Sequence, residues 1–203
     1  MWHMAATVLT AIDDAGVVDH VLIVTHEPDA VLRHIGHASH RTVIAQPRAD
    51  TGLNTAVGIG RDWAIAHWYQ RMLVVSADLP TLAAADVRTL VGRSDPVVIA
   101  PDRHGTGTNA LLLRLEASDH ETAIAGGPFT FGFGETSYNH HAEEARRLGL
   151  EAATIIAEGL QLDLDTPDDW SRLPPMTRDR MLIVVGHAAD EPQTGRQVTC
   201  SKT

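Results

Sequence analysis

The chain has 203 residues, 44% of them hydrophobic, and its 26 acidic and 16 basic side chains give a formal net charge of −10. This length is typical of one domain with a sizeable core, and the acidic balance argues against binding to nucleic acid or to an anionic membrane. A single cysteine excludes a disulfide framework, and no apolar run reaches the roughly 20 residues that span a membrane. Because the N-terminus also lacks the pattern of a signal peptide, we expect a cytoplasmic globular protein.

The first half of the chain alternates between helical and strand patterns. Apolar spacing and glycine stops predict helices over residues 5–15, 28–35, 52–67 and 83–91. Short apolar runs predict strands over residues 17–24, 41–45 and 72–76. We expect residues 17–24 to form a buried strand, and the nearly all-apolar run at 72–76 to be covered on both faces.

The second half continues the same alternation. The pattern predicts a helix over residues 137–148, and strands over 97–100, 110–113, 154–157 and 160–164. Thr166 and Pro167 predict the N-cap and the first position of a last helical turn. Further on, residues 181–185 predict one more strand and residues 190–203 a loose tail. Strands that alternate with helices predict a three-layer α/β fold with a mostly parallel sheet, whose ligands bind outside the carboxyl ends of the strands.

Three aspartates lie in or directly after predicted strands. Asp78 follows the strand over residues 72–76, where a divalent cation would bridge its carboxylate to a substrate phosphate. Asp163 and Asp165 stand two apart in a predicted strand, so both side chains would point to one face and converge on one metal ion. The alternative for each aspartate is a structural role as the cap of the following turn or helix.

Three further segments are rich in hydrogen-bond donors. Two glycines and two threonines within residues 102–110 favour a phosphate or carboxylate site, and the alternative is a hairpin loop between two strands. Gly52, Leu53 and Asn54 begin a predicted helix, whose N-terminus favours an anion or a polar base, although Asn54 would serve equally as a cap. Ser137 begins the helix that follows the three phenylalanines of the chain. On that helix His140 and His141 are expected to lie at the surface.

Lysine is almost absent, because Lys202 is the only lysine among the 16 basic residues. The chain therefore has no P-loop. A mechanism that needs a lysine outside the C-terminal end of this chain must do without one. It also lacks the Gly-x-Ser-x-Gly element that would support nucleophilic catalysis by serine.

Four motifs occur in the order in which a known family carries them. They are ADLP at residues 77–80, APDRHGTGTNALLL at 100–113, FGFG at 131–134 followed by Ser137 and His140, and LDLDTP at 162–167. Over roughly residues 5–173 the chain resembles the guanylyltransferases of coenzyme F-420 biosynthesis, which act on 2-phospho-L-lactate or phosphoenolpyruvate. The motif at 100–113 is the specific part, because ADLP and a late Asp-x-Asp occur in many nucleotidyltransferases.

This resemblance implies a Rossmann-like nucleotidyltransferase fold and the transfer of GMP from GTP to the phosphorylated acid, with release of pyrophosphate. The implied partners are GTP and either phosphoenolpyruvate or 2-phospho-L-lactate. The implied cofactor is Mg²⁺, held by Asp78, Asp163 and Asp165, of which Asp78 and Asp165 would be catalytic. The residues implied in binding are Thr108, Gly134 and Ser137 for the acid, and Gly52, Leu53 and Asn54 for the nucleotide, near its guanine.

The family normally begins with a strand and a loop rich in Lys, Arg and Ser, ahead of the helix that starts here near Ala5. We therefore expect residues 1–173 to form a nucleotidyltransferase domain without this first part, and residues 174–203 to form a loosely ordered C-terminal extension. A nucleotidyltransferase for a sugar phosphate or molybdopterin is an alternative, and so is an inactive remnant that still binds nucleotide. A homodimer is one assembly that the sequence leaves open.

Overall fold

The computed structural model of the chain describes residues 2–49, 51–115, 128–179 and 181. Its elements in chain order are α1 (Trp2–Ala15), β1 (Val21–Thr25), α2 (Pro28–Ile35), β2 (Arg41–Ala45), α3 (Leu53–Ala66), β3 (Arg71–Val75), α4 (Ala84–Val91), β4 (Val97–Pro101), β5 (Thr108–Arg114), α5 (Ser137–Arg147), β6 (Ala152–Thr154), α6 (Glu158–Gln161) and α7 (Pro167–Arg172). Within these ranges, no helix combines the length and the apolar character that a membrane crossing requires.

The described strands form two separate sheets. The larger sheet has the order β3-β5-β4-β6, and the smaller one pairs β1 with β2 in parallel. Strand β5 is antiparallel to both β3 and β4, whereas β6 is parallel to β4. Strands β3, β4 and β6 therefore run in one direction, so the larger sheet is mostly parallel, as predicted, with β5 as its reversed member.

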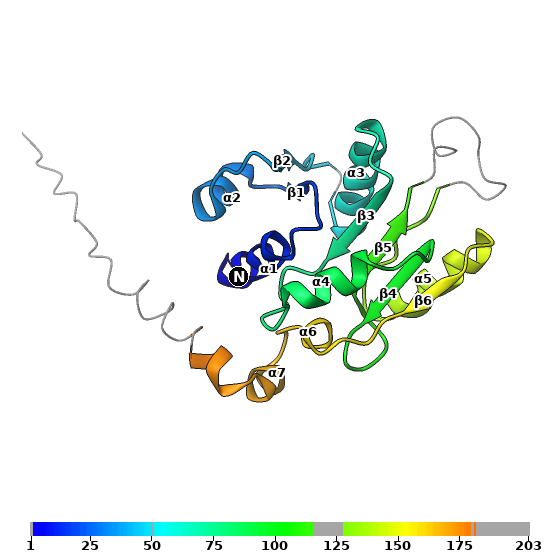
Figure 1. The fold of residues 1–203 in the computed structure, drawn as a ribbon. Coiled ribbons are helices and arrows are strands. Elements are labelled where there is room, and N and C mark those ends of the chain that lie inside the picture. Colours follow the sequence, from blue (N-terminus) through cyan, green and yellow to red (C-terminus); the bar gives the residue numbers. More distant parts are fainter. Residues whose placement is uncertain (1, 50, 116–127, 180, 182–203) are drawn as a thin grey trace, which may run out of the picture.

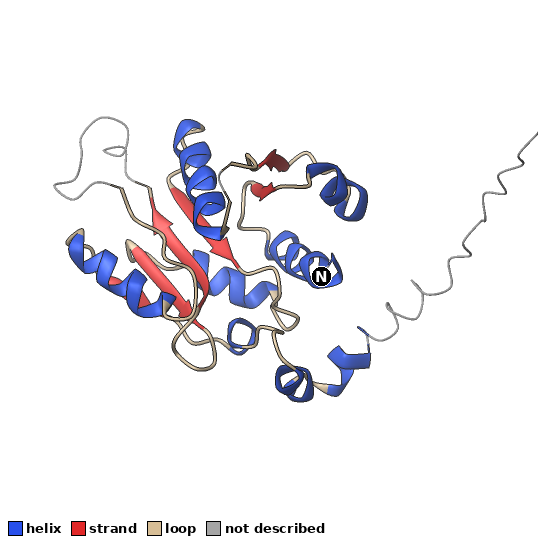
Figure 2. Ribbon diagram, turned by 180° about the vertical axis from the view of Figure 1, so that it is seen from behind, coloured by secondary structure: helices blue, strands red, loops and turns tan. Residues whose placement is uncertain are grey.

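Helices cover both faces of the larger sheet, which confirms the predicted three-layer fold (Figures 1 and 2). Alternate strand residues such as Val98 and Leu112 pack against α1 and α4 on one face. Their chain neighbours, such as Ile99 and Leu111, pack against α3 and α5 on the other face. Because neighbouring side chains of a strand point to opposite faces, a strand covered on both sides is apolar at every position.

Burial differs between the strands more than their composition does. All five residues of β4 are buried, whereas all five of β1 and all five of β3 are only half-buried. The expectation of a buried strand over residues 17–24 is therefore wrong. The strand expected at 72–76 is covered on both faces as predicted, because Leu73 and Val75 pack on one core cluster and Met72 and Val74 on the other, although its residues stay half-buried. The physical reason is that β1 and β3 are edge strands, each with one paired neighbour among the described strands. Both nevertheless pack on α3, where Met72 and Leu22 lie 3.4 and 3.8 Å from the position that a Cβ atom would take at Gly60.

The predicted elements agree with the structure apart from small shifts at their ends, except that β1 begins at Val21 rather than at residue 17 and that the C-terminal end differs. Residues 160–164 do not form a strand, because Leu160 is wholly buried within the short helix α6 and residues 162–165 follow without regular structure. Gly159 permits this turn, since a Cβ atom there would lie 2.1 Å from Asp86 Oδ2 and 2.8 Å from the Thr81 carbonyl oxygen. The strand expected at 154–157 is β6, two residues earlier. Of the strand expected over residues 181–185, only Met181 is described. The tail expected over residues 190–203 lies outside the described residues.

Candidate functional site

Asp78 lies in the turn that follows β3. Its carbonyl oxygen accepts a hydrogen bond from the backbone N–H of Leu164 at 3.2 Å, which holds the segment over residues 162–165 beside this turn. The Asp78 side chain is half-buried, and among the described residues its Oδ1 atom is buried without a hydrogen-bond partner. A buried carboxylate oxygen is costly when it is unpaired, so this atom favours a cation at the site.

The carboxylates of Asp78, Asp163 and Asp165 act on one another electrostatically. Burial raises the pKa of Asp78 above its ordinary value, and the charges of Asp165 and Asp163 raise this pKa further. Burial also raises the pKa of Asp163, with further contributions from Asp165, Asp102 and Asp169. Among the described residues, no three acidic, histidine or cysteine side chains are grouped closely enough to form a ready metal site. The structure therefore gathers acidic charge here, and the metal-binding role of the three aspartates stays a prediction.

The expectation that Asp163 and Asp165 share one face of a strand is wrong, because residues 162–165 are not in a strand. Asp163 is half-buried and Asp165 is exposed, so their environments differ. The backbone N–H of Asp165 donates to Asp169 Oδ2 at 3.3 Å, and Asp169 also accepts from the Thr166 N–H at 2.7 Å. Thr166 Oγ1 in turn accepts from the Asp169 N–H at 3.3 Å, which completes a reciprocal cap. The predicted roles of Thr166 as N-cap and Pro167 as the first helical residue are thus confirmed.

The segment over residues 102–107 connects the antiparallel strands β4 and β5, so it is the hairpin loop that the sequence left as an alternative. Asp102 organises this loop, because its Oδ1 accepts the Thr106 N–H at 2.9 Å and its carbonyl oxygen accepts the Gly105 N–H at 3.1 Å. Gly107 leaves room for the same carboxylate, whose Oδ2 lies 2.9 Å from the position of a Cβ atom at residue 107. The Asp102 N–H also donates to the Gly107 carbonyl oxygen at 3.2 Å, so three N–H groups of the loop are satisfied internally.

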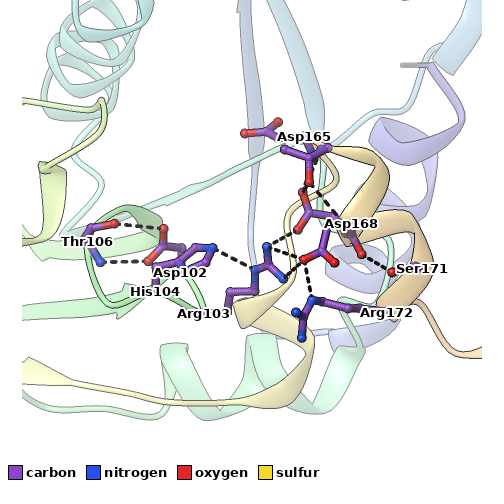
Figure 3. Close-up of polar contacts among 10 residues, drawn as sticks. Asp102, Arg103, His104, Thr106, Asp165, Asp168, Ser171 and Arg172 are labelled. Carbon is purple, nitrogen blue, oxygen red and sulfur yellow. Dashed lines mark hydrogen bonds and ion pairs between the residues drawn. The ribbon is translucent and has the colours of Figure 1, made fainter.

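Arg103 ties this hairpin loop to the start of α7 (Figure 3). Its guanidinium lies 2.8 Å from Asp169 Oδ1 and 3.5 Å from Asp168 Oδ2, and its backbone N–H donates to the Gln161 carbonyl oxygen at 2.9 Å. The Asp169 side chain is only 5% exposed, so this ion pair is shielded from water on one side. Arg103 thereby fixes the hairpin loop beside the segment that carries Asp163 and Asp165.

Thr108, the first residue of β5, contacts a histidine of α5. Thr108 Oγ1 lies 3.0 Å from His141 Nδ1, and the N–H of Gly132 donates to His141 Nε2 at 3.2 Å. His141 is 0% exposed, so the expectation of a surface position is wrong for this residue, whereas His140 is exposed as predicted. Burial, with a contribution from the charge of His140 and against an opposing one from Glu144, lowers the pKa of His141 from 6.5 to about 4. The ring is therefore neutral at pH 7.

The start of α5 brings together the three residues implied in acid binding. Ser137 is buried, and its N–H donates to the Gly134 carbonyl oxygen at 3.1 Å. The next N–H, of Tyr138, donates to the Thr106 carbonyl oxygen at 2.9 Å, which joins this helix start to the hairpin loop and so to Thr108. Two hydroxyl groups thus lie near the positive end of an 11-residue helix, an arrangement suited to an anion.

The segment over residues 129–134 packs against α5 and is held in place by it. Glu144 on α5 accepts the Thr130 N–H at 2.7 Å and pairs with Arg147 at 2.6 Å, and the Arg147 hydrogen bond lowers the pKa of Glu144 to about 2. At Gly132 a Cβ atom would fall 2.1 Å from the His140 ring, so only glycine fits there without a shift. These contacts fix the backbone whose N–H group meets His141.

Asn54 near the start of α3 joins the predicted nucleotide residues to this segment. Its Oδ1 accepts the Phe133 N–H at 2.7 Å, and its Nδ2 donates to the Phe133 carbonyl oxygen at 3.3 Å. Gly52 caps the helix with φ of 106°, a left-handed conformation that favours glycine, and the Leu53 side chain is 60% exposed. The nucleotide and acid residues of the prediction therefore meet at Phe133, and their binding roles stay predictions.

Sequence reasoning missed His141 and the bridging roles of Arg103 and Asp169. Helical spacing carries a usable signal for His141, because Ser137, His141, Ala145 and Leu148 recur every three or four residues and all four are buried. The Arg103–Asp169 pair joins residues far apart in the chain, so no local pattern indicates it.

Comparison with known proteins gives consistent similarities. Residues 2–174 match the family described as "Guanylyl transferase CofC like". The chain is 34% identical over 168 residues to a phosphoenolpyruvate guanylyltransferase of Sphaerobacter thermophilus, covering 82% of this chain and 74% of that protein. It is 37% identical over 158 residues to a 3-phospho-D-glycerate guanylyltransferase of Phenylobacterium zucineum, covering 76% and 66%. It is 32% identical over 159 residues to a 2-phospho-L-lactate guanylyltransferase of Methanothermobacter thermautotrophicus, covering 77% and 64%.

Solved structures share the fold at low sequence identity. A 4-diphosphocytidyl-2C-methyl-D-erythritol synthase from Anaerococcus prevotii superposes with a TM-score of 0.59 at 10% identity, covering 88% of this chain and 89% of that one. A protein assigned as a nucleotide-diphospho-sugar transferase from Desulfovibrio desulfuricans G20 gives a TM-score of 0.62 at 15% identity, covering 91% and 81%. This likeness supports the predicted Rossmann-like nucleotidyltransferase fold.

Proposed function

Because the chain belongs to the CofC-like guanylyl transferase family, we propose that it transfers GMP from GTP to a phosphorylated three-carbon acid and releases pyrophosphate. The similar proteins named above are guanylyltransferases for phosphoenolpyruvate, 3-phospho-D-glycerate and 2-phospho-L-lactate. All three acids carry a phosphate and a carboxylate on three carbons. This is the reaction that the family contributes to coenzyme F-420 biosynthesis.

One observation in the structure carries the proposal. The buried Oδ1 of Asp78, unpartnered among the described residues, lies among further acidic side chains. It lies at the end of the larger sheet where β5 begins, because the Ser76 N–H donates to the Asn109 carbonyl oxygen, and the start of α5 reaches the same end through the bond from the Tyr138 N–H to the Thr106 carbonyl oxygen. An acidic group favours a cation, and the positive end of a helix favours an anion. A sheet end that offers both suits a substrate that reacts through phosphate groups.

The bond changes of the transfer are simple. A phosphate oxygen of the acid attacks the α-phosphorus of GTP and forms a new P–O bond. The bond between the α-phosphorus and the bridging oxygen to the β-phosphorus breaks, and its electron pair leaves with pyrophosphate. The attacking phosphate is already ionised at neutral pH, so this chain needs no general base.

Asp78 would hold Mg²⁺ together with Asp163 or Asp165. The donor set fits, because Mg²⁺ prefers carboxylate oxygens, and Asp78 offers one that is buried without a partner among the described residues. When bound, the ion would neutralise charge on the phosphate oxygens as they reorganise. The Arg103–Asp169 contact would keep the segment with Asp163 and Asp165 within reach of Asp78.

Thr108, Gly134 and Ser137 would bind the acid at the start of α5. The two side-chain hydroxyls supply donors for a carboxylate or phosphate, and the helix dipole favours the negative charge. Gly52, Leu53 and Asn54 would lie near the guanine. Because the Asn54 amide bonds to the Phe133 backbone, its role would be to join the two substrate sites.

The test incubates the full chain with Mg²⁺, GTP and each of the three acids in turn, and measures pyrophosphate together with the mass of the product. We expect pyrophosphate and a GMP-acid conjugate with at least one acid, at least tenfold faster than with ATP or CTP in place of GTP. If the chain gives a folded circular dichroism spectrum yet releases pyrophosphate with none of the acids, the proposed function is wrong.

A further inference from the structure

The hydrogen bonds of His141 are compatible with only one tautomer of its ring. A backbone N–H only donates, so the bond from Gly132 requires His141 Nε2 to be an unprotonated acceptor. The ring is neutral at pH 7, so its single proton is on Nδ1. The contact of 3.0 Å between Nδ1 and Thr108 Oγ1 therefore has His141 as the donor and the threonine oxygen as the acceptor.

This direction determines what the Thr108 hydroxyl can do. Its own hydrogen points away from His141, and no other residue that the structure describes accepts it. Thr108 is 5% exposed, so bulk water does not readily take the place of an acceptor. A nearly buried hydroxyl with its donor free is ready for an acceptor from outside the protein.

We propose that His141 is a positioning residue that holds the Thr108 hydroxyl as a donor toward the carboxylate or phosphate of the acid substrate. This inference rests on the proposed function and adds a residue to it. If Nδ1 were an acceptor instead, Thr108 would donate to His141, and its oxygen would repel an anionic substrate. Which ring nitrogen carries the proton therefore determines whether the site can bind an acid.

The surroundings of His141 hold the ring in this role. The Phe133 ring lies edge-on at 4.7 Å between centroids, and Phe129 is 6.0 Å away. Ser137 stands one helical turn earlier on the same buried face of α5. Because both ring nitrogens are engaged by protein atoms and the side chain is 0% exposed, His141 cannot itself contact a substrate. Its effect must pass through Thr108.

Two conservative variants separate the two nitrogens of the ring. In His141→Asn the side-chain amide reaches the position of Nδ1 and can donate to Thr108, but it does not reach Gly132. In His141→Gln the amide reaches the position of Nε2 and can accept from Gly132, but it leaves Thr108 without a donor. Thr108→Val removes the hydroxyl at nearly constant shape.

The first experiment measures steady-state kinetics of the full chain with GTP and the best acid. Because a hydrogen bond to a charged group is stronger than one between neutral groups, we expect Thr108→Val and His141→Gln each to raise the KM of the acid about tenfold. We expect His141→Asn to stay within about threefold of the wild type, and the KM of GTP to change little in all three. The double variant Thr108→Val/His141→Gln should be no worse than Thr108→Val alone. The proposal would be overturned if the increases in the KM of the acid multiplied in the double variant. It would also be overturned if His141→Asn and His141→Gln raised this KM equally.

A second experiment does not depend on turnover. Nitrogen-15 NMR of the wild-type imidazole at pH 7 should show Nδ1 protonated and Nε2 unprotonated, and the opposite tautomer would overturn the proposal even if the enzyme is active. Calorimetry with phosphoenolpyruvate should show binding that weakens about tenfold in Thr108→Val and His141→Gln, and equal binding would again overturn it. Absence of turnover in a wild type that binds in this way would refute the proposed function alone.

Discussion

The two sheets of this molecule are built from similar sequences and differ in what surrounds them. In β4 the run VVIAP is buried at every position, whereas VLIVT in β1 is half-buried throughout. Among the described strands, β4 has paired neighbours on both edges, β5 and β6, whereas β1 pairs with β2 alone. Position within a sheet therefore decides burial, and apolar composition only permits it.

The candidate site follows the same division. Asp78, Thr108 and the start of α5 belong to the larger sheet and its covering helices, whereas Gly52–Asn54 follow the smaller sheet. The contact between Asn54 and the Phe133 backbone joins the two parts. We infer that the larger sheet carries the chemistry and most of the stability, and four predictions test this difference.

The largest effect is expected at Asp78, next to the edge strand of the larger sheet. Asp78→Asn should lower GMP transfer by about 10³-fold, or about 4 kcal/mol in the barrier, because a neutral amide is a poor ligand for Mg²⁺. Its thermal midpoint without Mg²⁺ should hold or rise, since the variant removes a buried charge that lacks a partner.

The matched control is Asp19→Asn, an exposed aspartate just before β1. Pyrophosphate release should remain near the wild-type rate in this control. If Asp78→Asn retained activity within threefold of the wild type, both the metal role of Asp78 and the assignment of chemistry to the larger sheet would fail.

The second prediction compares one substitution in the two sheets. Ile99→Ala in β4 should lower the free energy of unfolding by about 3–4 kcal/mol, because it leaves a cavity in a fully packed layer. Ile23→Ala in β1 should cost about 1–2 kcal/mol, since that side chain is already half-exposed. Urea denaturation of both variants measures the difference, and equal losses would show that the smaller sheet is as tightly packed as the larger.

The order of the elements could be predicted from the sequence, and the difference between the sheets could not. Apolar runs and glycine stops place α2 and β2 at the predicted residues, because these signals are local. The burial of β1 depends on which strand lies beside it, which is long-range information. The same limit explains the error at residues 160–164, where Leu160 joins the core cluster that includes Val87 and Leu90 of α4, and this packing overrides an alternating pattern.

The candidate site divides in the same way. Asp78 and Thr166 could be placed from local patterns, because one follows a strand and the other begins a helix. His141 and the Arg103–Asp169 pair depend on contacts between distant segments, so the sequence placed His141 at the surface and gave no sign of the pair.

The third prediction compares one histidine from each part of the molecule. Burial lowers the pKa of His141 on α5 to about 4, and it lowers the pKa of the half-buried His20 before β1 in the same direction, with contributions from His40 and His67. Between pH 6.5 and pH 4 the unfolded chain binds a proton at residue 141 that the folded chain does not bind. Stability supplied by the neutral His141 is therefore lost as pH falls through this window, by up to about 3 kcal/mol.

Urea denaturation across this pH range measures the free energy of unfolding. The effect of each histidine is the difference between the wild type and a variant without that titrating ring. The stability of the wild type relative to His141→Asn should decline from pH 6.5 to pH 4, and the same comparison with His20→Asn should decline less. A flat difference for His141, or a larger decline for His20, would contradict the assignment of the more deeply buried ring to the larger sheet.

The smallest effect on stability is expected at the contact that joins the two parts. Asn54→Ala removes both hydrogen bonds to the Phe133 backbone and should cost about 1 kcal/mol of stability, because the contact is exposed to water. The neighbouring Thr55→Ala is the matched control, since among the described residues the Thr55 hydroxyl donates only to the Thr51 carbonyl oxygen, at 3.4 Å. If Asn54 couples the nucleotide residues to the acid residues, its loss should raise the KM values of GTP and of the acid together, by about threefold to tenfold, whereas Thr55→Ala should leave both unchanged. A change confined to one substrate would show that the two sheets hold their parts of the site independently.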